Sequence, residues 1–289
     1  MKKQLALASS IVALTLLSGG AQADTPARQE GRVWIDQNFV LAFSPNWSLT
    51  TMPGARAEFA RTREGKAGLQ FLELFFGPNY TYKTGNWTFK GSLWYYYMGY
   101  PQLGRTVPGK PEDCSNPPLQ GSTSTYCTST YNFSHNLEII PSVEYRWGRW
   151  SIYDRVIFHN TFYADVYSTP DQRLGWGTVL RELLQGRFAV TDRFGISLSD
   201  EVFLGILEDG DTSSIAGGKG YIAPGYWKDG FRANRTYLGF DYKVTPNFTI
   251  APMYMVEVML NPTDSTDVTD IAHTLFVVAT VTASTFGNK

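Results

Sequence analysis

The segment from Phe231 to Leu260 contains two stretches in which apolar side chains recur at every second position, and all the charged side chains of these stretches fall at the positions between them. The apolar positions are Leu238, Phe240, Tyr242 and Val244 in the first stretch, and Phe248, Ile250, Pro252, Tyr254, Val256 and Val258 in the second. A period of two is typical of a β-strand, because successive side chains point to opposite faces of a sheet. Pro246 and Asn247 favour a tight turn between the stretches. The predicted hairpin has one apolar and one charged face, which fits a membrane-spanning hairpin or a hairpin of a soluble sandwich.

The lengths of the connections along the chain favour the membrane-spanning alternative. Five short turns fall at 44–46, 84–86, 148–149, 191–193 and 245–247, and each is followed by an aromatic residue: Trp47, Trp87, Trp150, Phe194 and Phe248. Five longer connections alternate with them, at about 63–68, 101–131, 168–175, 207–230 and 261–270. Short turns at one end, long loops at the other and aromatics beside the short turns are typical of outer-membrane barrels. The sequence therefore predicts an all-β, antiparallel transmembrane barrel with short periplasmic turns and long extracellular loops.

Eleven strands are predicted, at 32–43, 47–61, 69–83, 87–100, 133–147, 150–167, 174–190, 194–206, 231–244, 248–260 and 271–286. Bacterial single-chain barrels usually have an even number of strands. We therefore expect about twelve strands, with a short additional one within 24–31. The alternative is ten, with 32–43 lying inside the lumen.

The first 23 residues have the features of a cleaved signal peptide: Lys2 and Lys3, an apolar stretch at 5–17, and Ala21-Gln22-Ala23 before the expected cleavage point. Residues 24–289 then form a single barrel domain, and no later apolar run reaches the roughly 18 residues of a transmembrane helix. Aromatic residues make up 15% and charged residues 18% of the chain, the latter below the usual fraction of about 25%. We expect export to a bacterial outer membrane.

The expected partners follow from that location. They are outer-membrane lipid and lipopolysaccharide, with the barrel-assembly machinery during biogenesis. The formal net charge of −1 gives no indication of a nucleic-acid partner. No cofactor and no metal site are predicted, and the oligomeric state stays open.

Both cysteines, Cys114 and Cys127, lie in the longest predicted loop, 101–131. An even number of cysteines in an oxidising compartment favours one disulfide between them. The loop also contains several prolines, so it is expected to be a shaped loop, either stabilised at the surface or folded over or into the barrel.

If the apolar positions face lipid, the opposite positions place balanced charges in the lumen. The cations are Arg56, Lys83, Lys90, Arg146, Arg155, Arg181, Arg187, Arg235 and Lys243, and the anions are Asp36, Glu58, Glu73, Glu138, Glu144, Asp165, Glu201, Asp241 and Glu257. Such balance favours ion pairs across neighbouring strands that fill the interior. A small, weakly selective or gated channel is the alternative. The expected pairs join Arg146, Arg155, Arg181, Arg187 and Arg235 to Glu138, Glu144, Glu201 and Glu257.

A few residues depart from this pattern. Glu182 and Asp200 fall at lipid-facing positions, where a carboxylate is costly. A β-bulge that turns each one inward is expected, and a subunit contact is the alternative. His273 has lipid-facing parity near the outer rim, where a lipid-acting barrel enzyme would hold its base, but the sequence lacks the His-x-Ser-Asn-Gly motif of outer-membrane phospholipases. A receptor or adhesin acting through the loops at 101–131 and 207–230 is a further alternative.

Two phrases, RELLQGRFAVTDRFGISLSDEVF at 181–203 and FRANRTYLGFDYKVTPNFTIAPMYM at 231–255, resemble the domain-of-unknown-function family 2490 of bacterial outer-membrane barrels. That family shows an arginine-rich strand, an acidic-Val-Phe strand, and an asparagine-arginine strand with a Leu-Gly-aromatic sequence. The resemblance covers mainly the C-terminal half. It implies a barrel in the outer membrane and indicates no substrate.

Overall fold

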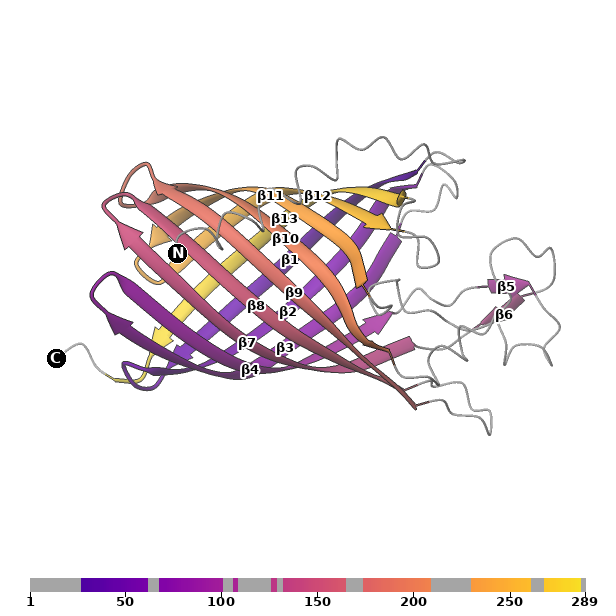
Figure 1. The fold of residues 1–289 in the computed structure, drawn as a ribbon, viewed down its shortest axis with the longest axis horizontal. Helices are drawn as coiled ribbons and strands as arrows, with labels where there is room; N and C mark the ends of the chain where they lie inside the picture. Colours follow the sequence, from indigo (N-terminus) through magenta and orange to yellow (C-terminus); the bar gives the residue numbers. More distant parts are fainter. Residues whose placement is uncertain are drawn as a thin grey trace, which may run out of the picture.

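The computed structural model describes residues 27–61, 68–100, 106–108, 126–128, 132–164, 174–208, 230–260 and 268–286. The predicted signal peptide and Cys114 lie outside these ranges, so signal cleavage and the disulfide stay predictions. Within them no helix is long and apolar enough to cross a membrane. The described chain is all-β and closes into a barrel, which confirms the predicted fold class (Figure 1).

The closed barrel contains eleven of the described strands. They are β1 (Arg28–Ala42), β2 (Trp47–Arg61), β3 (Gly68–Thr84), β4 (Trp87–Tyr100), β7 (Asn132–Trp147), β8 (Trp150–Ala164), β9 (Leu174–Ala189), β10 (Phe194–Glu208), β11 (Gly230–Thr245), β12 (Phe248–Leu260) and β13 (Val268–Ser284). Two short strands, β5 (Thr106–Pro108) and β6 (Tyr126–Thr128), which carries Cys127, pair with each other in a separate sheet.

The first and last strands close the barrel in parallel. Each strand from β1 onward reverses direction, so an odd number of strands leaves the first and the last running the same way. β1 pairs with β13 in unbroken register from Arg28↔Asp270 to Ala42↔Ser284, and with β2 in the antiparallel sense on its other edge. The segment expected at 32–43 therefore lies in the wall and not in the lumen. We call the parallel pairing of β1 with β13 the seam. Because these two strands pair directly, the barrel closes without the twelfth strand that an even count would require.

The residues in the short connections favour tight turns between the strands. Gly85 and Gly148 adopt φ angles of 55° and 57° in two of the turns, a left-handed conformation that glycine adopts without steric cost. In another turn, the Thr191 hydroxyl accepts hydrogen bonds from the backbone N–H groups of Arg193 and Phe194 at 3.2 and 2.9 Å. The glycine conformations and the hydrogen bonds of Thr191 stabilise tight turns, and these turns lie at one end of the barrel (Figure 1).

Aromatic side chains stand beside these turns as predicted. Trp47 packs on Tyr80 with ring centroids 5.0 Å apart, Trp87 on Tyr145 at 4.6 Å, and Trp150 on Phe188 at 4.7 Å. Each pair joins residues directly opposite one another on neighbouring strands. Such cross-strand pairs stabilise the sheet and fix its register.

The wall has two chemically different faces. Large apolar side chains such as Ile35, Leu74 and Leu238 are exposed on the outside. The alternate positions turn inward, and there Glu201, Glu257 and other charged residues are buried. The charges are thus enclosed by the barrel, and the apolar surface faces its surroundings.

Glu182 and Asp200 do not turn inward, so the expected β-bulge is wrong. The register of β9 with β10 is continuous through both residues and shifts only between Gly205 and Leu207. Asp200 stays on the outer face, where Asn234 donates to both carboxylate oxygens at 3.0 Å and the Thr236 hydroxyl donates at 3.1 Å. Neighbouring polar side chains therefore solvate this carboxylate without a change of register.

Candidate functional site

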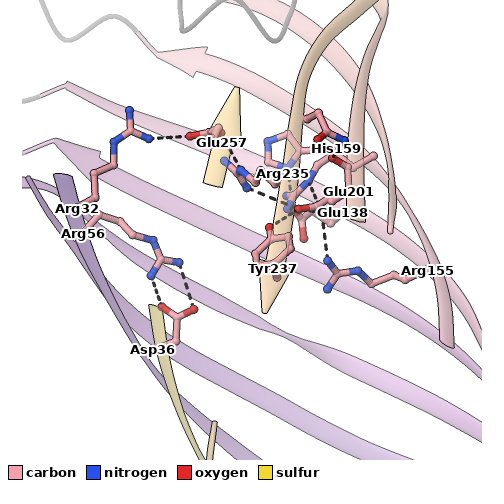
Figure 2. A network of polar contacts seen from close by, with 12 residues as sticks. Arg32, Asp36, Arg56, Glu138, Arg155, His159, Glu201, Arg235, Tyr237 and Glu257 are labelled. Carbon is pink, nitrogen blue, oxygen red and sulfur yellow. Dashed lines mark hydrogen bonds and ion pairs between the residues drawn. The ribbon is translucent and has the colours of Figure 1, made fainter. Parts of the chain in front are cut away.

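A ring of charged and aromatic side chains crosses the lumen at mid-height, and Glu201 on β10 is its most connected member (Figure 2). Its Oε1 atom accepts from Arg181 at 2.8 Å and from Arg155 at 3.2 Å. Its Oε2 atom accepts from the Tyr237 hydroxyl at 2.6 Å and lies 3.8 Å from an Arg235 nitrogen. This one fully buried carboxylate thus interacts with three guanidinium groups, each from a different strand.

Arg235 continues the ring toward the seam. It lies directly opposite Glu257 in the β11–β12 register and donates to Oε1 of that carboxylate at 2.7 Å. Arg32 on β1 donates to the other oxygen, Oε2, at 2.7 Å and also pairs with Glu30. Glu257 therefore bridges β11 and β1 across the parallel seam (Figure 2).

On the other side of the seam, Arg56 on β2 is the next member of the ring. It binds both oxygens of Asp36 at 2.6 and 3.1 Å and forms an ion pair with Glu73 on β3. Glu73 also accepts from the Tyr96 hydroxyl on β4 at 2.6 Å. Gly54 gives this group its space, because a Cβ there would overlap Asp36 Oδ1 and lie 2.8 Å from Glu73 Oε1.

His159 on β8 completes the circuit. Its ring lies edge-on to Tyr96 with centroids 5.7 Å apart, and its Nδ1 atom is 2.5 Å from Glu138 Oε1 on β7. Glu138 in turn lies 3.7 Å from Arg181 on β9. With Phe276 of β13 under Arg56 at 5.1 Å, every barrel strand contributes a side chain to the ring.

Apolar side chains fill the space that the ring encloses. Trp34 on β1, Leu183 on β9, Tyr237 on β11 and Met255 on β12 form one buried cluster. β1 and β9 are five strands apart in an eleven-stranded barrel, so this cluster joins nearly opposite walls. Trp34 also lies between Arg56 and Arg235, whose guanidinium carbons are 4.5 and 5.0 Å from its ring.

The remaining predicted lumen charges lie toward the short turns. Arg187 binds Asp241 through two bonds of 2.7 Å, not one of the glutamates expected as partners. Arg146 binds Glu144 of its own strand through two bonds of 2.8 Å. The other members of the predicted set at this end are Lys83, Lys90 and Lys243. The side chain of Glu58 and all of Asp165 lie outside what the structure describes.

Sequence reasoning missed several members of the ring. Arg32 and Glu30 share the inward parity of Asp36. Arg32 is the first residue of the predicted strand 32–43 but was not counted among the lumen charges, and extending that strand by two residues would have included Glu30. Tyr96 and Tyr237 were unrecognised because alternation assigns a tyrosine to a face without indicating a hydrogen-bond partner.

His273 lies on the outer face, as its parity predicted. Its Nδ1 atom is hydrogen-bonded to the Tyr254 hydroxyl at 2.6 Å, and its Nε2 atom lies 3.3 Å from Gln29 Oε1 across the seam. No serine contacts it among the described hydrogen bonds. Among all the residues that the structure describes, no group of three or more His, Cys, Asp or Glu side chains could hold a metal ion.

Comparisons with known proteins give weak likenesses to outer-membrane proteins. The high-pH structure of OprB from Pseudomonas putida is 13% identical with a TM-score of 0.31, and the match covers 82% of this chain and 55% of that one, so the chain spans about half its length. OmpT of Vibrio cholerae is 11% identical with a TM-score of 0.27, covering 86% and 94%. No family model and no curated protein matches, so the family resemblance stays a prediction.

Proposed function

We propose that this protein is an integral outer-membrane barrel whose lumen is closed at mid-height, so that in its resting state it is a structural barrel and not an open pore. The apolar outer face supports the membrane location, because a β-sheet can span lipid only when it closes and pairs all its backbone groups. The aromatics beside the short turns support placing that end at the periplasmic interface. Outer-membrane lipid and lipopolysaccharide would then surround the barrel, inserted by the barrel-assembly machinery.

The buried cluster of Trp34, Leu183, Tyr237 and Met255 carries the proposal of a closed lumen. A conducting pore needs a continuous path of water, and its charged walls stay hydrated. Here the carboxylates of Glu138, Glu201 and Glu257 are almost completely buried, and apolar side chains from nearly opposite walls meet between them. This arrangement favours a barrel held rigid by its interior over a channel.

Purified protein reconstituted into phospholipid vesicles tests both parts. We expect it to co-sediment with the vesicles after alkaline washing and to migrate as a compact species on a denaturing gel until it is boiled. We also expect no swelling of these vesicles in isotonic arabinose, a sugar small enough to enter a narrow pore. Recovery in the soluble fraction would refute the membrane location, and rapid swelling would refute the closed lumen.

A further inference from the structure

The two members of each ion pair differ in how far water reaches them. The Arg155 side chain is 29% exposed whereas Glu201, its partner, is 0% exposed. Arg181, which pairs with the same carboxylate, is 18% exposed. In the pair of Arg146 with Glu144, the arginine is 68% exposed and the glutamate 18%. In all described pairs the basic side chain is the more exposed one. Equal numbers of charges therefore do not give a neutral surface: the wetted wall of the lumen is cationic.

Among the described residues of the lumen, those in the short-turn half have the largest excess of cations over carboxylates. Its described inner-face cations outside the ring are Lys83, Lys90, Arg146, Arg187 and Lys243, and its carboxylates are Glu144 and Asp241. Both carboxylates are already bound by arginines. An anion that enters through this mouth would meet attractive charges along its path.

Lys90 on β4 lies at the inner end of this path. Its Nζ atom is 5.8 Å from the centroid of the Trp94 ring, and no carboxylate of the described chain pairs with it. It lies opposite Ser142 on β7, which lies opposite Arg155 on β8. Adjacent strands are about 4.8 Å apart, so roughly 10 Å separates the backbones of the two cations, a span that their long side chains can close.

Arg155 has hydrogen-bonding capacity left. Glu201 binds one of its terminal nitrogens, but its Nε atom is buried without a hydrogen-bond partner in the described chain. Lys90 and Arg155 are also close enough to repel each other electrostatically. An anion between two such cations would remove the repulsion and satisfy the unused donors.

We propose that Lys90, Ser142 and Arg155 form a binding site for an oxyanion, a phosphate or a carboxylate group, on the short-turn side of the closed lumen. The ammonium and the guanidinium group donate charge-assisted hydrogen bonds to the oxyanion. The Ser142 hydroxyl between them donates to the Lys90 backbone carbonyl at 3.4 Å in this structure, and it would turn away from that oxygen to donate a third bond to the anion. The site lies within the lumen whatever membrane surrounds the barrel, so it stands or fails separately from the proposed location.

Calorimetric titration of the full-length folded protein tests this site. Inorganic phosphate and, in a second series, acetate are titrated in an uncharged detergent at low ionic strength. We expect saturable binding of at least one anion, and Lys90→Gln should weaken it about tenfold, because it removes a charge-assisted hydrogen bond. Lys83→Gln, which removes the same charge at the exposed mouth, should weaken it less than about threefold, and Lys90→Arg should retain it.

Three results would overturn the proposal: no saturable heat with either anion, equal affinity in the wild type and Lys90→Gln, or equal losses in Lys90→Gln and Lys83→Gln. The last would mean a diffuse field and no site. Heat-dependent gel mobility verifies that each variant is folded. If Lys90→Gln does not fold, Lys90→Met serves instead, because its unbranched stem can keep the packing against Trp94.

Discussion

Replacing Glu201 by glutamine removes one negative charge from the centre of the ring while the length and shape of the side chain stay nearly the same. Arg155, Arg181 and Arg235 would then share a neutral amide, and the Tyr237 hydroxyl would lose its ionised acceptor. Removing one partner of a buried ion pair costs roughly 3–5 kcal/mol. Because Arg155 and Arg181 are partly exposed, water replaces some of the lost solvation, and we expect a loss of about 3 kcal/mol.

The assay is reversible unfolding by a chemical denaturant in phospholipid vesicles, which reports the free energy of unfolding. Glu144→Gln is the matched control, because it makes the same change in an ion pair with the largely exposed Arg146. Its expected cost is about 0.5 kcal/mol or less. If Glu201→Gln costs no more than this control, the buried network does not stabilise the barrel and the reasoning fails.

Three further predictions concern other parts of the molecule. Trp34→Ala removes the side chain that joins the apolar cluster to two arginines, so we expect a loss of about 3–5 kcal/mol in the same assay and intermittent conductance in planar bilayers; silence would mean that Trp34 does not close the lumen. Glu182→Leu should stabilise the barrel by about 1–2 kcal/mol because a carboxylate leaves the lipid-facing wall, whereas Asp200→Leu should not, since Asn234 and Thr236 would lose their acceptor; the opposite order would refute the outward placement. Thiol labelling of unreduced protein should fail at Cys114 and Cys127, and labelling of either one would exclude the disulfide.

Local patterns in the sequence were enough to predict the hairpins and the faces of their strands. Arg235 and Glu257 illustrate this success, because they lie on the same face of one predicted hairpin, 11 residues before Pro246 and 10 residues after Asn247. With the one-residue register shift between Lys243 and Thr245 they meet directly across the hairpin. Period-two alternation and turn chemistry determine such contacts within a few residues of sequence.

Contacts made by closure of the barrel could not be predicted in the same way. Arg32 and Glu257 are 225 residues apart and meet only because β1 pairs with β13. The expectation of an even strand count assigned that first strand to a position next to an additional strand or inside the lumen. The exposure of the lumen charges is the other property that the sequence did not predict. Nine cations and nine anions suggest a neutral lumen, but the carboxylates are more deeply buried than their basic partners, so the surface that water reaches is cationic.

Single-channel recording of the refolded wild-type protein in a planar lipid bilayer tests the closed lumen most directly. Trp34→Ala is recorded under the same conditions, and co-sedimentation of each protein with lipid vesicles shows that both insert. We predict that the wild type gives no conductance steps, whereas the variant gives intermittent ones. Regular steps of uniform size from the wild type would contradict a lumen closed by the ring and its apolar cluster.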